Sequence, residues 1–139
     1  MSDASLRRIS SGVPGLDTIL HGGFIDERMY LILGEPGTGK TLLGMSFLET
    51  GLENDENVLF IHSEESRKDI LVNGNRVGID LSDADFLDLG PDSEFFSQDH
   101  SYELVNPTDL ESEQVIEDIR ETIEQLDPDR VLFDPITQL

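Results

Sequence analysis

The feature that most constrains the fold is the run GEPGTGKT at residues 34–41. It matches the pattern G-x-x-x-x-G-K-[ST], in which consecutive backbone N–H groups turn inward toward phosphate oxygens. The apolar run MYLIL at residues 29–33 predicts a buried strand before it, and residues 41–50 predict a helix after it. Gly51 is well placed at the C-terminal cap of that helix. The run therefore has the context of a phosphate-binding loop between a strand and a helix.

Each fixed position of this loop has a chemical reason. Gly34, Gly37 and Gly39 allow backbone conformations that a Cβ atom would block. The helix that begins near Gly39 adds the positive end of its dipole. Lys40 supplies a charge to the β- and γ-phosphates, and the Thr41 hydroxyl is a ligand for Mg²⁺. The loop thus predicts a site for a nucleoside triphosphate with Mg²⁺, against the alternative of an ordinary Gly-rich turn.

Carboxylates follow two other apolar strands. Residues 131–133 predict a buried strand that ends in Asp134, from where such folds hold the water shell of Mg²⁺. Alternatively, Asp134 simply starts a turn. Residues 58–61 predict a strand that leads to Glu64 and Glu65, at the sheet edge where ligands bind. One of these two carboxylates would orient or deprotonate an attacking water, or both belong to a solvated helix start.

Strands alternate with helices along the whole chain. Further segments are a helix over residues 66–77, a short strand over 86–89, and a helix over 108–126 whose apolar residues recur at spacings of three and four. This alternation predicts the α/β class, with a parallel sheet flanked by helices. The length of 139 residues allows one domain, residues 1–139.

The charge of the chain is unusual. Nine basic and 30 acidic residues give a net charge of −21. Residues 80–139 contain 18 acidic and 2 basic residues, whereas residues 1–79 contain 12 and 7. At about 1 M salt the Debye length is roughly 3 Å, so the self-repulsion of such a surface is screened. We favour adaptation to high internal salt over the alternative, an acidic surface that binds a partner.

Composition also makes several classes of function unlikely. No basic face is available for non-specific binding of nucleic acid. No apolar run is long enough to span a membrane, and the absence of cysteine fits a cytoplasmic location. His21, His62 and His100 lack the spacing of a metal site, and we interpret them as surface or packing residues.

Several stretches together resemble the KaiC-type branch of the RecA superfamily. They are RISSGVPGLDTILHGGF, LILGEPGTGKTLL, FIHSEES, NRVGIDL and VLFDPITQL. The branch includes the archaeal KaiC-like, GvpD-like and RadA/RadB-like ATPases. The resemblance covers nearly the whole chain, and its segment G-[VI]-P-G-L-D, here GVPGLD, is specific to this branch.

The resemblance implies a RecA-like P-loop fold that hydrolyses ATP with Mg²⁺. It assigns Glu64 and Glu65 to water activation and Asp134 to the Walker B position. The residues that it assigns to the triphosphate are Gly37, Thr38, Gly39, Lys40, Thr41 and Leu42. Pro135 departs from the family, which often has serine there. A full-length relative would form a homo-oligomer, a hexameric ring in which a neighbouring subunit completes the site.

The same resemblance implies an incomplete sheet. In RecA-like folds, the strand between the loop strand and the Walker B strand comes later in the sequence than Walker B. We therefore expect the N-terminal part of one domain, with unpaired backbone groups that each cost roughly 1–3 kcal/mol. Two alternatives to an ATPase module stay open: a non-catalytic fragment that binds nucleotide or a partner, and a RadA/RadB-like DNA-binding ATPase. A kinase is weaker still, because no phosphoacceptor region is present.

Overall fold

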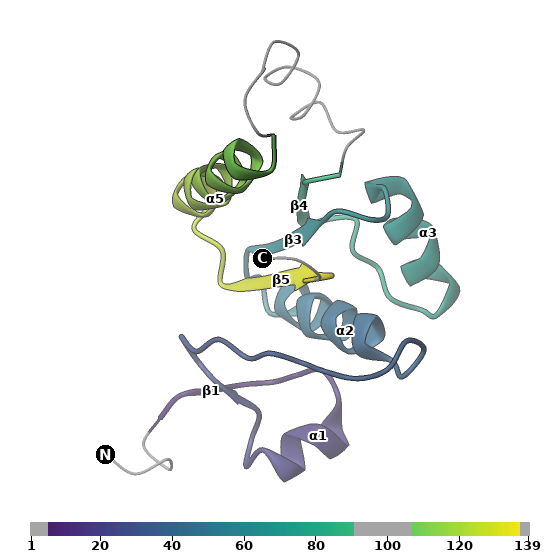
Figure 1. Ribbon diagram of the computed structural model, residues 1–139. Helices are drawn as coiled ribbons and strands as arrows, with labels where there is room; N and C mark the ends of the chain where they lie inside the picture. The colour runs from purple at the N-terminus through teal and green to yellow at the C-terminus, as the bar shows by residue number, and fades with distance from the viewer. Residues whose placement is uncertain (1–5, 91–106, 137–139) are drawn as a thin grey trace.

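The computed structural model of the chain describes residues 6–90 and 107–136, with the side chains of its last helix described from residue 113 onward. Its elements are β1 (Arg8–Ile9), α1 (Pro14–Ile19), β2 (Phe24–Ile25), α2 (Lys40–Glu53), β3 (Val58–His62), α3 (Arg67–Arg76), β4 (Asp85–Asp88), α5 (Pro107–Leu126) and β5 (Arg130–Asp134). Strands β3, β4 and β5 lie at the centre with helices around them (Figure 1). This confirms the predicted α/β class, a parallel sheet flanked by helices as expected for a RecA-like fold.

The three-stranded parallel sheet has the order β4–β3–β5. All five residues of β3 are buried, because this middle strand has a neighbour on each side and helices over both faces. In register, His62 at the end of β3 lies opposite Asp88 of β4 and Asp134 of β5. The carboxyl ends of the three strands therefore meet at one edge, with two carboxylates flanking a buried histidine.

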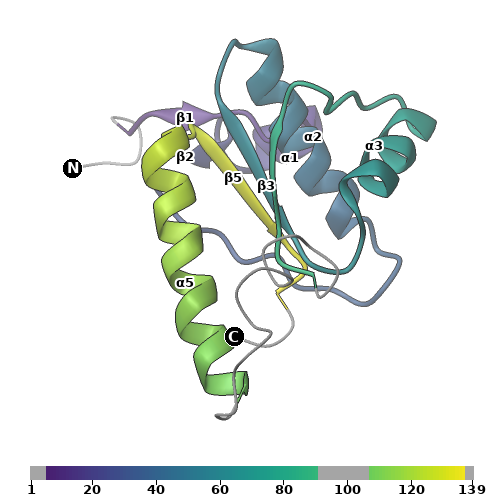
Figure 2. The ribbon, with the colours of Figure 1, turned by 90° about the horizontal axis from the view of Figure 1, so that it is seen from above.

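Two apolar layers hold the sheet between its helices. Figure 2 shows α5 on one side of the strands and α2 and α3 on the other. Val58 and Phe60 of β3 pack with α2 and α3, whereas Leu59 and Ile61 pack toward α5. The residues that complete the α5 layer include Val115, Ile119, Leu126 and Phe133. Among the described residues, no helix has both the length and the apolar composition needed to cross a bilayer.

Helix α2 lies very close to β5 because glycines face the strand. A Cβ atom on Gly44 would lie 2.6 Å from Cδ1 of Leu132, and one on Gly51 would lie 2.7 Å from Cδ of Arg130. The prediction that Gly51 caps the helix is therefore wrong. Gly51 is a buried residue within α2, and the cap is Asn54, whose N–H donates to the Thr50 carbonyl oxygen at 3.2 Å. Gly51 therefore allows α2 to pack closely on β5 and does not form a turn.

The N-terminal residues form a small unit against α2. Strands β1 and β2 pair antiparallel, and α1 lies between them in the sequence. The loop before α1 approaches α2 at Gly12, where a Cβ atom would lie 2.6 Å from the Ser46 carbonyl oxygen. The unit therefore packs on the helix that follows the loop of residues 34–41.

The predicted strand over residues 29–33 is wrong. These residues have no regular secondary structure, and Met29, Leu31 and Leu33 are 97%, 66% and 81% exposed. Figure 1 shows them in the blue trace that leads from the N-terminal strands to α2. A strand requires a hydrogen-bonded neighbour, and among the described residues β5 pairs with β3 alone. The apolar sequence is present, but the described sheet offers it no edge to join.

Candidate functional site

The loop of residues 34–41 joins the apolar segment to the start of α2. Gly37 and Gly39 have φ angles of +82° and +96°, in the left-handed region that side chains with a Cβ rarely adopt. Gly39 is the N-cap of α2, a helix of 14 residues. The free backbone N–H groups of this helix start therefore face the loop, as anion binding requires.

The Lys40 side chain folds back over the same loop. Its Nζ donates to the Gly34 carbonyl oxygen and, at 3.1 Å, to the Glu35 carbonyl oxygen. Thr38 Oγ1 also donates to the Glu35 carbonyl oxygen, at 2.7 Å. Within the described residues this ammonium bonds to neutral carbonyl groups, and it can exchange them for phosphate oxygens, which carry a full charge and form stronger bonds.

Thr41 and Asp134 meet although they are 93 residues apart. Thr41 Oγ1 donates to Asp134 Oδ2 at 2.8 Å, which joins the first turn of α2 to the carboxyl end of β5. A hydroxyl and a carboxylate are hard oxygen donors of the kind that Mg²⁺ takes, together with waters and substrate phosphates. Among the described residues no group of three or more His, Cys, Asp or Glu side chains forms a metal site. The hydroxyl and carboxylate oxygens of this pair are of the kind that Mg²⁺ accepts alongside waters and phosphates.

Glu64 and Glu65 stand in the turn between β3 and α3, and both are exposed. The Glu65 carboxylate accepts a hydrogen bond from Asn73 Nδ2 at 2.7 Å. For the Glu64 carboxylate, the described part of the chain supplies no hydrogen bond or ion pair. Ser66 then caps α3 by accepting the N–H of Asp69 at 3.1 Å. The two carboxylates thus differ: that of Glu65 is hydrogen-bonded to Asn73, whereas that of Glu64 has no partner among the described residues.

The structure brings part of the predicted set together. The loop, Lys40, Thr41 and Asp134 are connected through the hydrogen bonds above, and Leu42 is exposed in the first turn of α2. The acidic pair follows β3 by two residues, so it shares the sheet edge with Asp134. Within the described residues, no hydrogen bond joins either glutamate to the loop or to Asp134.

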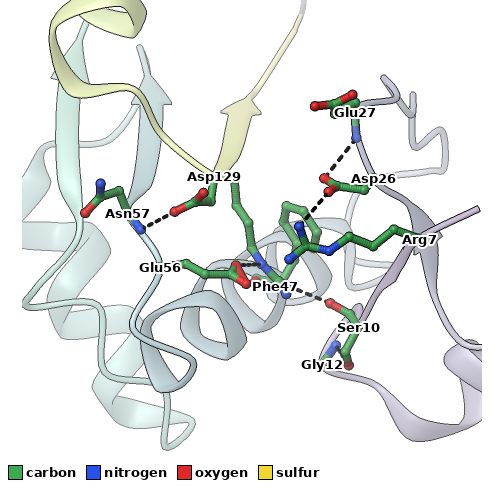
Figure 3. A network of polar contacts seen from close by, with 10 residues as sticks. Arg7, Ser10, Gly12, Asp26, Glu27, Phe47, Glu56, Asn57 and Asp129 are labelled. Carbon is green, nitrogen blue, oxygen red and sulfur yellow. Dashed lines mark hydrogen bonds and ion pairs between the residues drawn. The ribbon is translucent and has the colours of Figure 1, made fainter.

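Sequence reasoning missed a buried arginine that anchors β5. The Arg130 guanidinium donates to the carbonyl oxygens of Ser10 and Phe47 at 2.6 and 2.9 Å, and lies 4.7 Å from the Phe47 ring centroid. Ser10, Phe47 and Glu56, which Figure 3 labels within one network of contacts, all bond to Arg130 from separate parts of the chain. A signal existed: Arg130 opens an apolar strand in a chain with only nine basic residues.

Asn73 and the buried His62 were also missed as neighbours of the acidic pair. Asn73 gave no signal, because its contact with Glu65 depends on how α3 folds back on the turn. His62 was interpreted as a surface or packing residue, and its 1% exposure agrees with packing. Its position at the end of the apolar run, two residues before Glu64, was the one signal that could have found it.

Comparisons with known proteins agree on one family. The profile of the KaiC ATPase family matches residues 9–139. The chain is 31% identical over 144 residues to the UPF0273 protein PH0284 of Pyrococcus horikoshii, covering 96% of this chain and 56% of that protein. It is 34% identical over 132 residues to the circadian clock oscillator protein KaiC of Prochlorococcus marinus MIT 9313, covering 95% and 24%. The chain therefore spans about half of the first relative and a quarter of the second.

Proposed function

The chain belongs to the KaiC family of ATPases, and on that premise we propose that it binds Mg-ATP at residues 34–42 and hydrolyses the terminal phosphate bond. The observation that carries the proposal is the hydrogen bond from Thr41 Oγ1 to Asp134 Oδ2 at 2.8 Å. This bond supports the proposal because it joins the two residues that we expect to hold Mg²⁺, next to a loop whose glycines and lysine suit phosphate oxygens.

The loop residues have separate tasks in binding. Backbone N–H groups from Gly37 to Leu42 would donate to the phosphate oxygens, and Thr38 and Gly39 keep the loop in the required conformation. Lys40 would leave the Gly34 and Glu35 carbonyl oxygens and pair with the β- and γ-phosphates. Thr41 and Asp134 would hold Mg²⁺, directly or through its water shell. When bound, the metal neutralises charge that develops on the phosphate oxygens.

Hydrolysis also requires a water that is aligned and deprotonated. We assign the proton transfer to Glu64, because its carboxylate has no partner among the described residues. The oxygen of that water bonds to the γ-phosphorus, the bond from γ-phosphorus to the ADP oxygen breaks, and the water proton passes to Glu64. Glu65 would orient the turn and the water, since Asn73 already restrains its carboxylate.

The family also supports an assembly in which subunits share sites. In this proposal the full-length protein forms a homo-oligomeric ring, and a neighbouring subunit completes the nucleotide site. The chain spans about half of the first curated relative, so the ring and its shared sites are proposed by analogy with longer relatives.

The experiment is ATP turnover in concentrated KCl, with phosphate release as the measured quantity. A salt concentration of several molar screens the charge of −21. Lys40→Ala should reduce turnover to background, because the loop loses its phosphate-binding charge. Lys68→Ala is the matched control, since Lys68 is the only other lysine of the chain and is exposed on α3. Equal turnover in the two variants would contradict the proposal.

A second candidate, binding of nucleotide or of a partner without hydrolysis, is favoured by a different observation. Met29, Leu31 and Leu33 expose their apolar side chains directly before the loop. Large exposed apolar surface is typical of interaction sites. Nucleotide binding without turnover, together with a complex with a longer homologue, would favour this candidate over an ATPase.

A further inference from the structure

His62 is the last residue of the middle strand and lies immediately before the acidic turn. Its side chain is 1% exposed, although histidine is fully buried less often than aliphatic residues are. Nδ1 lies 2.7 Å from the carbonyl oxygen of Glu65, three residues later. The ring therefore connects the rigid end of β3 to the turn that carries both glutamates.

The hydrogen-bond chemistry fixes which nitrogen carries the proton. A carbonyl oxygen only accepts, so Nδ1 must be the N–H donor in this contact. Nε2 is buried and has no hydrogen-bond partner in the described residues. The ring meets the Phe60 and Phe86 rings edge-on, with centroid distances of 5.9 and 5.8 Å. Within the described residues, Nε2 is therefore buried and unpaired among aromatic rings, which costs free energy. Nδ1 meanwhile donates to the Glu65 carbonyl oxygen.

Glu65 is consequently held at two points by two different elements. His62 of β3 binds its carbonyl oxygen, and Asn73 of α3 binds its carboxylate oxygen Oε2 at 2.7 Å. His62 itself is well fixed, because its own carbonyl oxygen accepts the N–H of Leu89 at 2.7 Å, next to β4. The turn between β3 and α3 is thereby restrained by both of the elements that it connects.

We propose that His62 is a positioning residue for ATP hydrolysis: its Nδ1–H bond to the Glu65 carbonyl oxygen holds the turn that presents the Glu64 and Glu65 carboxylates at the sheet edge. This inference rests on the proposed function. His62 has no contact with the phosphate-binding loop among the described residues, so it acts on the turnover step and leaves nucleotide binding intact. A displacement of about 1 Å in a reacting group can cost about 100-fold in rate.

The experiment compares two substitutions at the same position. His62→Leu keeps the apolar packing and removes the donor, whereas His62→Asn keeps an N–H donor close to the position of Nδ1. We expect His62→Leu to lower kcat by about tenfold to 100-fold. Its affinity for a fluorescent ATP analogue, measured with Mg²⁺, should stay within about twofold of the starting protein. His62→Asn should recover most of the lost kcat.

Three kinetic outcomes would overturn the inference. They are an unchanged kcat in His62→Leu, a parallel loss of affinity and kcat, or a folded His62→Asn that is as slow as His62→Leu. If His62→Leu fails to fold, Asn73→Ala provides the second test. Asn73 is exposed, and its substitution removes the other hydrogen bond to Glu65. It should lower kcat at unchanged nucleotide affinity, and an unchanged kcat would contradict the restrained turn.

A measurement that needs no turnover separates this inference from the proposed function. Amide hydrogen exchange of residues 63–66 should be faster in His62→Leu and should return toward the original rate in His62→Asn. If the unsubstituted chain hydrolyses no ATP but these exchange rates change as expected, the ATPase proposal fails and the anchoring by His62 stands. Unchanged exchange in a folded His62→Leu would overturn the anchoring whatever the turnover.

Discussion

Arg130 Nε donates to Glu56 Oε1 at 2.6 Å, which joins two residues 74 positions apart in the sequence. The Arg130 side chain is 2% exposed and that of Glu56 19%, so water could not fully solvate either charged group if its partner were removed. The guanidinium also bonds the carbonyl oxygens of Ser10 and Phe47. The buried charge is therefore neutralised and hydrogen-bonded at the point where β5 begins.

Removal of this arginine should destabilise the fold. Arg130→Met keeps much of the side-chain volume but leaves the Glu56 carboxylate without its partner, so the free energy of unfolding should fall by roughly 3–5 kcal/mol. Urea denaturation in concentrated KCl measures this change. Arg120→Met is the control, because Arg120 pairs with Glu117 and Glu124 on the exposed surface of α5, where ion pairs contribute little. Equal losses in the two variants would show that burial of Arg130 is not important.

The two glutamates should contribute unequally to turnover. Glu64→Gln should lower kcat by about 100-fold or more, because general-base catalysis typically contributes that much. Glu65→Gln should have a smaller effect, since an amide can still bond to Asn73. Steady-state phosphate release at saturating Mg-ATP measures both, with Glu113→Gln on the exposed part of α5 as the control. An unchanged rate in the double variant Glu64→Gln, Glu65→Gln would remove both residues from the mechanism.

The bond between Thr41 and Asp134 predicts a change in Mg²⁺ dependence. Asp134→Asn removes a charge from the pair, and Thr41→Val removes the hydroxyl, so each should raise the Mg²⁺ concentration that supports half-maximal turnover by about tenfold or more. Thr41→Ser keeps the hydroxyl and should stay close to the original value. The measurement is a titration of turnover with MgCl₂ at fixed ATP. The assignment fails if all three variants titrate like the starting protein.

The loss of folding stability at acid pH should depend on Asp17. Burial raises the pKa of Asp17, but hydrogen bonds from Ser10 Oγ, Ser11 Oγ and the Ser11 N–H outweigh burial, and the nearby Arg130 charge adds to them. The pKa of Asp17 therefore lies below its ordinary value of 3.8. Such a carboxyl stabilises the folded chain above the ordinary value, and the contribution is lost as the pH falls through the lower, folded-state pKa. Asp17→Asn should be less stable at neutral pH, with a shallower loss of stability below about pH 4. Urea denaturation at several pH values measures this, and parallel profiles would contradict it.

Local patterns were sufficient to predict the elements that have their partners nearby. The apolar run before Glu64 became β3, the run before Asp134 became β5, and the phosphate-binding loop meets the helix that was expected after it. In these cases the hydrophobic pattern, the glycines and the flanking polar residues all favour the same structure, and the described fold agrees with them.

Contacts between distant parts of the chain explain what could not be predicted. Residues 29–33 have the composition of a strand, but strand formation depends on a neighbour that no local pattern specifies. Gly51 is a residue type typical of a helix cap, but its role depends on its contact with Arg130, 79 positions later in the sequence. The hold of Asn73 on Glu65 likewise depends on the direction in which α3 leaves the turn. The residues of the candidate site could be named from the sequence and stay a prediction, whereas the contacts that hold them could not be named.

Helix α2 and strand β5 run in opposite directions and are connected at three levels: Thr41 with Asp134, Gly44 against Leu132, and Gly51 against Arg130. Because neither glycine has a side chain, helix and strand pack closely, and a larger residue at either position would force the two elements apart. The same two elements carry the bond between Thr41 and Asp134 at one end and, through Arg130, the bond to Ser10 at the other. A residue that separates α2 from β5 would therefore disturb both ends at once, the Thr41–Asp134 pair and the contact of Arg130 with Ser10.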